Sequence, residues 1–458
     1  MRKIIIASDS FKGSLTSLEV ARAAEEGVKM VEDTKAEEGV KMVEDAKEVE
    51  NTEKTKKDSW GYEKCDDRDN RECDNRDNRK CEDRDSRECE DRDNKECEDR
   101  DNREWDIRCI EIADGGEGTA ATLTRVLGGD VVKAIVSDPL GRKIEATYGI
   151  ATISGQKTAI MEMAQASGLT LLKPSERNPL LTSTYGTGEM ILDALNRGCR
   201  RFLIGIGGSA TNDGGTGMLE ALGFKFIDSN GRQITGMCGG KINKIARISL
   251  PARLKEAEFI IACDVDTPFC GREGAAEVFG PQKGATPEGV VLLEDGMQNI
   301  NDIIKRDYGI DLSSIKGTGA AGGLGGAFHA FLNGRLQSGI GMVLDAIGFE
   351  EQIKDADLII TGEGRIDSQT CRGKVISGIT SVAAKHGVPV IAIAGIVDMS
   401  EKEIEESGLK AVFPIGPRPQ NESDLEYAMR PEVASKNISE TVAKALASLF
   451  PSSFHGNL

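Results

Sequence analysis

Histidine is almost absent from this chain: only His329, His386 and His455 occur among 458 residues. None of them lies in a polar loop, so hydride or acyl transfer that depends on a histidine base is poorly supported. Aromatic residues make up only 4% of the chain, so the core must consist mainly of aliphatic side chains, alanine and methionine. No run of 18 or more apolar residues occurs, which predicts that no helix crosses a membrane.

Positive charge is also in short supply, because 58 Lys and Arg face 76 Asp and Glu for a formal net charge of −18. Such an acidic surface disfavours nucleic acid and anionic membranes as partners. The first residues, Met1–Asp9, become polar too soon for a secretory signal and are typical of a β-strand. The eleven cysteines form no framework of a small secreted domain, so we expect a cytoplasmic protein with reduced thiols.

A repetitive acidic segment interrupts the globular pattern. Glu25–Asp33 recurs almost unchanged as Glu37–Asp45, and an eight-residue unit then places cysteines at Cys65, Cys73, Cys81, Cys89 and Cys97. C-x-x-C pairs are absent there, and on a helix each cysteine would be rotated by roughly 80° from the last. We predict that 34–106 is an insertion, disordered or loosely helical. A role of the 64–104 repeat in binding partners or metal stays open.

The rest of the chain alternates short apolar runs with helical patterns. This alternation predicts an α/β fold with a mainly parallel sheet, in which ligands bind at the carboxyl ends of the strands. Strands are expected at Ile4–Ala7, Cys109–Ile112, Ile144–Ile150, Lys157–Met161, Arg201–Ile206, Phe259–Cys263, Leu358–Thr361 and Val388–Ile393. Helices are expected at Leu18–Met30, Gly188–Arg197, Gly215–Leu222, Ile340–Ile347, Lys374–Lys385 and Ser439–Leu449.

The most informative loop, Ile204–Gly217, follows an apolar run and precedes a helical pattern. Its glycines remove the Cβ atoms that would hold a phosphate away from the backbone amides. The part Gly205–Ala210 also fits a weak dinucleotide fingerprint, with Asp228 at 18 residues beyond Ala210. Against that reading, the loop stays polar where a dinucleotide fold would already be helical.

Two loops after the first strands combine acids, hydroxyls and glycines. Ser8–Ser14 offers Lys12 as a clamp for phosphate or carboxylate and Asp9 as a base or metal ligand. Ala113–Thr119 places two acids beside glycines at a helix start, where they suit magnesium or proton transfer. Each loop could instead be a turn that caps the helix after it.

Further polar loops follow later strands and helices. They are Thr182–Glu189, Cys263–Asp266, Gly280–Gly284, Gly317–Gly326 and Thr361–Asp367. Hydroxyls, carboxylates, a lysine and an arginine in such positions suit a charged small ligand. The alternatives are ordinary caps, solvated turns, surface ion pairs and close helix packing. None of these loops is a Walker A motif.

Taken together, these motifs resemble the bacterial-type glycerate kinases, or glycerate 2-kinases. The matching stretches are Ser8–Ser14, Ala113–Thr119, Asp138–Gly141, Met161–Ala164, Gly205–Gly217, Phe279–Gly284, Gly319–Gly323 and Thr361–Asp367. They occur in the family's order and cover nearly everything outside the repeat. Position 8 departs from the family pattern, because the chain has Ser8 where members commonly have proline.

The resemblance implies ATP-dependent phosphorylation of D-glycerate with Mg²⁺, giving 2-phosphoglycerate. It also implies two α/β domains: a discontinuous Rossmann-like domain from 1–33, 107–147 and 317–458, and an inserted flavodoxin-like domain at 148–316. A nicotinamide-dependent oxidoreductase using Gly205–Ala210 remains the alternative enzyme. The oligomeric state is left open.

The resulting site hypothesis divides the candidate residues by role. The catalytic candidates are Asp9, Lys12, Asp114 and Asp264. The nucleotide-binding candidates are Gly207, Gly208, Ser209, Thr211, Asn212, Gly214, Gly215, Lys283, Gly319 and Gly322. The substrate-binding candidates are Ser10, Glu117, Thr187 and Arg365, and the metal candidates are Asp213 and Glu363.

Overall fold

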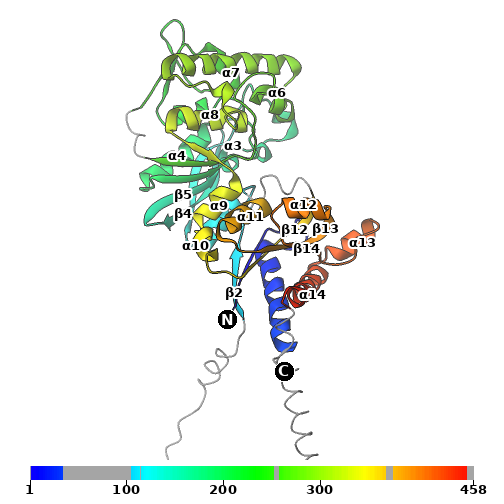
Figure 1. Cartoon of the computed structure of the whole chain (residues 1–458). Coiled ribbons are helices and arrows are strands. Elements are labelled where there is room, and N and C mark those ends of the chain that lie inside the picture. Colours follow the sequence, from blue (N-terminus) through cyan, green and yellow to red (C-terminus); the bar gives the residue numbers. More distant parts are fainter. Residues whose placement is uncertain (1, 35–104, 114, 252–256, 368–374, 451–458) are drawn as a thin grey trace, which may run out of the picture.

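The structure is a computed structural model that describes residues 2–34, 105–113, 115–251, 257–367 and 375–450. It contains two large β-sheets, each with helices on both faces, and the helix-covered sheets are stacked one above the other (Figure 1). The predicted α/β class with parallel sheets is confirmed. In the part of the chain that is described, no helix is both long and apolar enough to cross a membrane.

The five-stranded sheet joins the two ends of the chain. Its order is β14 (Ala411–Pro414), β13 (Val390–Asp398), β12 (Leu358–Asp367), β1 (Arg2–Ser8) and β2 (Trp105–Glu111), and every neighbouring pair is parallel. The central strands are continuous aliphatic runs because helices cover both faces. One face carries the helix that includes residues 17–34 and α14 (Pro431–Leu449), and the other carries α10 (Phe349–Ile353) and α11 (Val375–His386).

The six-stranded sheet comes from the middle of the chain. Its order is β11 (Arg335–Gln337), β10 (Glu258–Ala262), β6 (Arg201–Gly205), β5 (Gln156–Glu162), β4 (Lys143–Ile153) and β3 (Asp130–Ser137), with β4 antiparallel to both neighbours. One face carries α4 (Tyr185–Asn196), α5 (Thr216–Ala221), α7 (Pro287–Tyr308) and α8 (Ala320–Leu332). The other face carries α2 (Thr119–Val126).

Smaller elements complete the described part of the chain. A three-stranded antiparallel sheet has the order β8 (Gln233–Ile234), β7 (Lys225–Ile227), β9 (Arg247–Ser249). The short helices are α3 (Ala164–Ser167), α6 (Ala275–Phe279), α12 (Glu401–Glu406) and α13 (Glu422–Ala428).

Helix α9 (Gly339–Ala346) packs on β10 of the six-stranded sheet and on α10 and α11, which cover one face of the five-stranded sheet. Ile340 and Leu344 are buried in the core beneath the five-stranded sheet. Met342 and Val343 are buried in the core beneath the six-stranded sheet. A single helix of eight residues therefore fixes the two sheets next to each other.

Every strand and helix expected from the sequence overlaps an element of the structure. The sequence reading missed β3 and the long helix α7, although Thr286 caps that helix and is followed by proline at its first position. The six-stranded sheet extends from residue 130 to residue 337, beyond the expected 148–316 on both sides. Sheet membership alone does not define a domain, so the predicted domain boundaries stay a prediction.

Of the predicted insertion at 34–106, residues 35–104 lie outside the described residues, whereas residue 34 ends a helix and residues 105 and 106 belong to β2. β2 begins at Trp105 and pairs with β1 over its full length, as Arg2↔Trp105 to Ser8↔Glu111. The backbone N–H of Trp105 donates to Glu32 Oε1 at 3.1 Å, so the helix containing Glu32 passes beside the start of β2. A few residues can therefore connect position 34 to position 105.

We predict that replacing 35–104 by a short Gly/Ser linker leaves the folded domains intact. The free energy of unfolding should rise by no more than about 2 kcal/mol, since each doubling of loop length costs only about 0.6 kcal/mol of loop-closure entropy. Urea unfolding of the shortened and full-length chains, followed by circular dichroism, measures this. Loss of cooperative unfolding in the shortened chain would contradict it.

Candidate functional site

A pocket of about 1520 Å³ lies where the carboxyl ends of the two sheets meet. The five-stranded sheet contributes β12, β13 and the loops after β1, β2 and β14 to its walls, and the six-stranded sheet contributes the loops after β10 and β11. Helices α13 and α14 complete the lining. Parallel strands end at a common edge, so residues that are distant in sequence meet here. The expectation that polar loops gather at strand ends is thus met for part of the chain.

The loop after β1 is held firmly against its neighbours. Ser8 Oγ donates to the carbonyl of Gly362 at 3.0 Å, and the Asp9 N–H donates to the same carbonyl at 3.2 Å. Ser17 Oγ donates to the Ser8 carbonyl at 2.6 Å and accepts from the Ile112 N–H at 3.2 Å. These bonds join the ends of β1, β2 and β12 and fix the backbone that carries Asp9.

Two pocket arginines share one carboxylate. Arg365 Nη2 lies 2.5 Å from Asp398 Oδ2, and Arg418 Nη2 lies 2.8 Å from Asp398 Oδ1. Arg365 comes from β12, Asp398 from the end of β13, and Arg418 from the loop after β14. Asp367 also lies 3.9 Å from Arg365 Nε, so two carboxylates balance the two guanidinium groups.

Asp264 connects the six-stranded sheet to α9. Its Oδ1 accepts a hydrogen bond of 2.8 Å from the Gly339 N–H at the first residue of that helix. Gly115 packs on the same residue, since a Cβ at position 115 would lie 2.4 Å from Gly339 Cα. The loops after β2 and β10 therefore meet at the start of α9.

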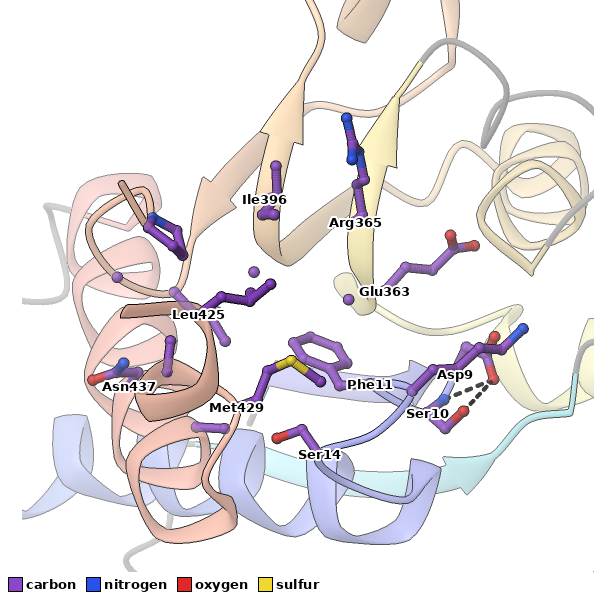
Figure 2. Close-up of a pocket in the computed structure, with 18 of the residues that line it drawn as sticks. Asp9, Ser10, Phe11, Ser14, Glu363, Arg365, Ile396, Leu425, Met429 and Asn437 are labelled. Atoms are coloured by element: carbon purple, nitrogen blue, oxygen red, sulfur yellow. Dashed lines mark hydrogen bonds between the residues drawn. The ribbon is translucent and has the colours of Figure 1, made fainter. Parts of the chain in front are cut away.

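Six of the predicted site residues line the pocket: Asp9, Ser10, Lys12, Asp264, Glu363 and Arg365. Asp9 Oδ1 accepts from the Ser10 N–H at 2.6 Å, which orients this carboxylate. In Figure 2 the side chains of Asp9 and Glu363 lie at one end of the pocket, away from Leu425 and Asn437.

Two other predicted residues, Glu117 and Thr187, do not line the pocket, and a third cannot be placed. Asp114 lies outside the described residues. Glu117 is exposed beside the pocket residue Gly116 but does not line the pocket itself. Thr187 is buried in α4, where its hydroxyl lies 2.8 Å from Ser167 Oγ.

The predicted nucleotide loop after β6 lies elsewhere, interlocked with the glycine run at the start of α8. The Gly214 N–H donates to the Gly322 carbonyl at 2.9 Å. Gly322 has φ +66°, and a Cβ there would lie 2.0 Å from the Thr211 carbonyl oxygen. The Gly319 N–H donates to the Thr267 carbonyl at 3.0 Å. The glycines here allow two backbones to pack closely.

Asp213, predicted as a metal ligand, is fully buried and accepts four hydrogen bonds. The donors are the Thr184 N–H and hydroxyl at 2.9 and 2.8 Å and the N–H groups of Gly215 and Gly217 at 3.1 Å each. Burial raises its pKa, while these hydrogen bonds lower it. This geometry favours a structural cap of α5 over a metal ligand.

Lys283, predicted to hold phosphate, is 2% exposed and donates to the Thr211 carbonyl at 2.7 Å. Removal from water lowers its pKa to about 7, and the charge of Asp213 opposes that shift. Neither side chain lines the pocket. The start of the loop after β6 is less buried than the part around Asp213: Gly207 and Gly208 are exposed and Ser209 is half-buried.

The amides from Ala210 to Gly217 are largely used within the protein. The Ala210 N–H, for example, donates to the Ser167 carbonyl at 2.9 Å. Amides that already have protein acceptors cannot also cradle phosphate. The assignment of nucleotide binding to this loop gains no support from the geometry and stays a prediction.

Several pocket residues were not anticipated from the sequence. They are Ser338, Arg418, Leu425, Tyr427, Met429 and Asn437. A signal existed for Ser338, which caps α9 by accepting from the Gly341 N–H at 3.2 Å. Within the described part of the chain, no three His, Cys, Asp or Glu side chains are grouped so that they could hold a metal by themselves.

Comparisons with known proteins agree with one another. A family model described as "Glycerate kinase family" matches residues 91–450. A glycerate kinase of Halalkalibacterium halodurans is 46% identical over 334 residues, which is 70% of this chain and 87% of the relative. A glycerate 2-kinase of Escherichia coli K12 is 46% identical over 310 residues, covering 67% and 80%. The crystal structure of a candidate glycerate kinase 2 from Salmonella typhimurium LT2 superposes with a TM-score of 0.72 at 35% identity, covering 99% of each chain.

Burial of Lys283 predicts a specific pH dependence of stability. Its pKa is about 7 when folded, against about 10.4 in an unfolded chain, so the unfolded state binds more protons between these values. Lys283 therefore lowers stability most below pH 7, and that penalty shrinks as the pH rises toward 10. The free energy of unfolding of the wild type minus that of Lys283→Met should increase from pH 7 to pH 9, by at most about 1.4 kcal/mol per pH unit. Urea titrations of both proteins measure it, and parallel curves would contradict it.

Proposed function

This chain belongs to the glycerate kinase family and is a kinase, and we propose that it transfers the terminal phosphoryl group of ATP to D-glycerate, giving 2-phosphoglycerate. The proposal is supported by the family membership and by the names of the relatives. We also propose that the protein is located in the cytoplasm. The fingerprint Gly205–Ala210 is not followed directly by a helix, because α5 begins only at Thr216, so the oxidoreductase alternative finds no support.

The observation that carries the proposal is the composition of the pocket. Carboxylates, a lysine and an arginine from three different segments meet at the strand ends: Asp9, Lys12, Asp264, Glu363 and Arg365. Phosphoryl transfer needs alignment and charge neutralisation more than covalent chemistry. The pocket also exceeds the ~300–1,000 Å³ of a typical ligand site, so it has room for a nucleotide and a three-carbon acid together.

Two of the basic side chains in the pocket, Lys12 and Arg365, have separate tasks in this proposal. Lys12, exposed in the loop after β1, holds the phosphate groups as a mobile point charge. Arg365 binds the glycerate carboxylate, because a guanidinium can form two parallel hydrogen bonds with it. Its link to Asp398 fixes the orientation of the guanidinium.

The acidic side chains suit Mg²⁺, since carboxylate oxygens are hard ligands. With no cluster of three acids in the described residues, Asp9 and Glu363 would supply one or two ligands, and phosphate oxygens and water would supply the rest. The bound ion would neutralise phosphate charge. Asp264, held by the Gly339 N–H through one oxygen, would accept the proton of the glycerate hydroxyl.

The proposed reaction has a direct test. Purified protein with ATP, Mg²⁺ and D-glycerate should release ADP, measured with a coupled assay, and ³¹P NMR should show the phosphate on the 2-hydroxyl. A 3-phosphoglycerate product would correct the regiochemistry alone. Absence of glycerate-dependent ADP release would overturn the proposal, since an oxidoreductase makes no ADP.

The proposed roles predict which substitutions abolish turnover. Lys12→Met and Asp264→Asn should each lower kcat by roughly 100-fold or more, as expected for groups that stabilise charge or move a proton in the transition state. Asp228→Asn is a matched control, because Asp228 also accepts backbone N–H bonds but lies in a turn away from the pocket. Unchanged kcat in both pocket variants, with normal circular dichroism, would refute the assignment.

A further inference from the structure

The pocket has a polar end and an apolar end. At the polar end lie the carboxylates of Asp9 and Glu363, and at the other end Figure 2 shows Leu425, Met429 and Asn437. The apolar side chains that line the pocket are Phe11, Ile396, Ile415, Pro417, Pro419, Leu425, Met429, Val433 and Ala434, and the loop after β14 and α13 also contribute Arg418, Gln420, Ser423 and Asp424. D-Glycerate has three carbons that carry a carboxylate and two hydroxyls, so it has almost no apolar surface to bury there.

Two polar groups at this end of the pocket have no hydrogen-bond partner among the residues that the structure describes. The carboxamide of Asn437 makes no hydrogen bond to any residue in the described ranges, and Ser14 Oγ is shielded from solvent and equally without a described partner. Asn437 projects from α14 over Gly416, where a Cβ would lie only 3.1 Å from Asn437 Nδ2. Polar groups at the wall of an apolar cavity that are unused by the protein are typical of a ligand site.

We propose that the apolar end binds the nucleobase of the phosphoryl donor and that Asn437 recognises adenine. A carboxamide presents one acceptor and one donor side by side, which match the amino group and the adjacent ring nitrogen of adenine. Guanine presents two acceptors at the corresponding edge, so a single carboxamide pairs with it less well. The flat apolar walls then cover the faces of the base.

This placement fits the rest of the pocket. With the base between α14 and the loop after β14, the phosphate groups extend toward Lys12 and the carboxylates at the polar end. The inference rests on the proposed function for the identity of the nucleotide. It goes beyond that proposal by naming the subsite and the residue that selects the base.

Calorimetric binding tests the subsite without turnover. Asn437→Leu should weaken ADP binding about tenfold, because the base loses two hydrogen bonds, while inorganic tripolyphosphate binds as to the wild type. Asn437→Asp, which keeps the shape and removes the donor, provides a second variant should the leucine variant fold poorly. Asn196→Leu is the matched control, since Asn196 is an exposed helical asparagine in α4 outside the pocket.

Kinetics add a second readout. Asn437→Leu should raise the KM for ATP about tenfold, leave the KM for D-glycerate unchanged, and reduce the preference for ATP over GTP. Unchanged ADP affinity in both Asn437 variants, or an equal loss of tripolyphosphate binding, would overturn the inference. If the wild type binds ADP but does not phosphorylate glycerate, the proposed function is wrong. The binding data for the Asn437 variants then still show whether the adenine subsite exists.

Discussion

The packing of α9 between the two sheets is the constraint on which the site depends. Ile340 and Leu344 bury one side of this helix in the core that α10 and α11 share with the five-stranded sheet, and Met342 and Val343 bury another side in the core beneath the six-stranded sheet. The helix begins beside the pocket, where the N–H of its first residue, Gly339, donates a hydrogen bond to the carboxylate of Asp264. The same contacts that join the sheets thus bring their carboxyl ends to one cavity.

Much of the architecture could be predicted because its physical signals are local. Short aliphatic runs such as Ile4–Ala7 signal strands buried on both faces, and the expected strands and helices all overlap observed elements. Helix α7 was missed because Gly289 and Gly296 and its many polar residues weaken its pattern. The sequence also predicted that the repeat lies between a helix and a strand. β1 and β2, which lie on either side of it in sequence, pair in the structure.

The site was predictable only in part, because loop chemistry does not reveal where a loop points. The acids and bases after β1, β10 and within β12 line the pocket, as Asp9, Asp264 and Arg365 demonstrate. The glycine-rich loop after β6 carries the same sequence signals, but its Gly214 amide binds the start of α8, and Asp213 accepts bonds from the loop itself and from Thr184. Asn437 lies in the middle of a regular helix, where nothing in the local pattern marks it as a pocket residue.

The central claim is that the cavity between the two sheets, and not the glycine-rich loop after β6, holds the reacting groups. A crystal structure of the full chain with a non-hydrolysable ATP analogue, Mg²⁺ and D-glycerate tests it most directly. Both ligands are expected in the cavity bounded by Asp9, Asp264 and Arg365. Density for the triphosphate on the amides of Gly207–Gly215, with that cavity empty of ligand, would contradict it.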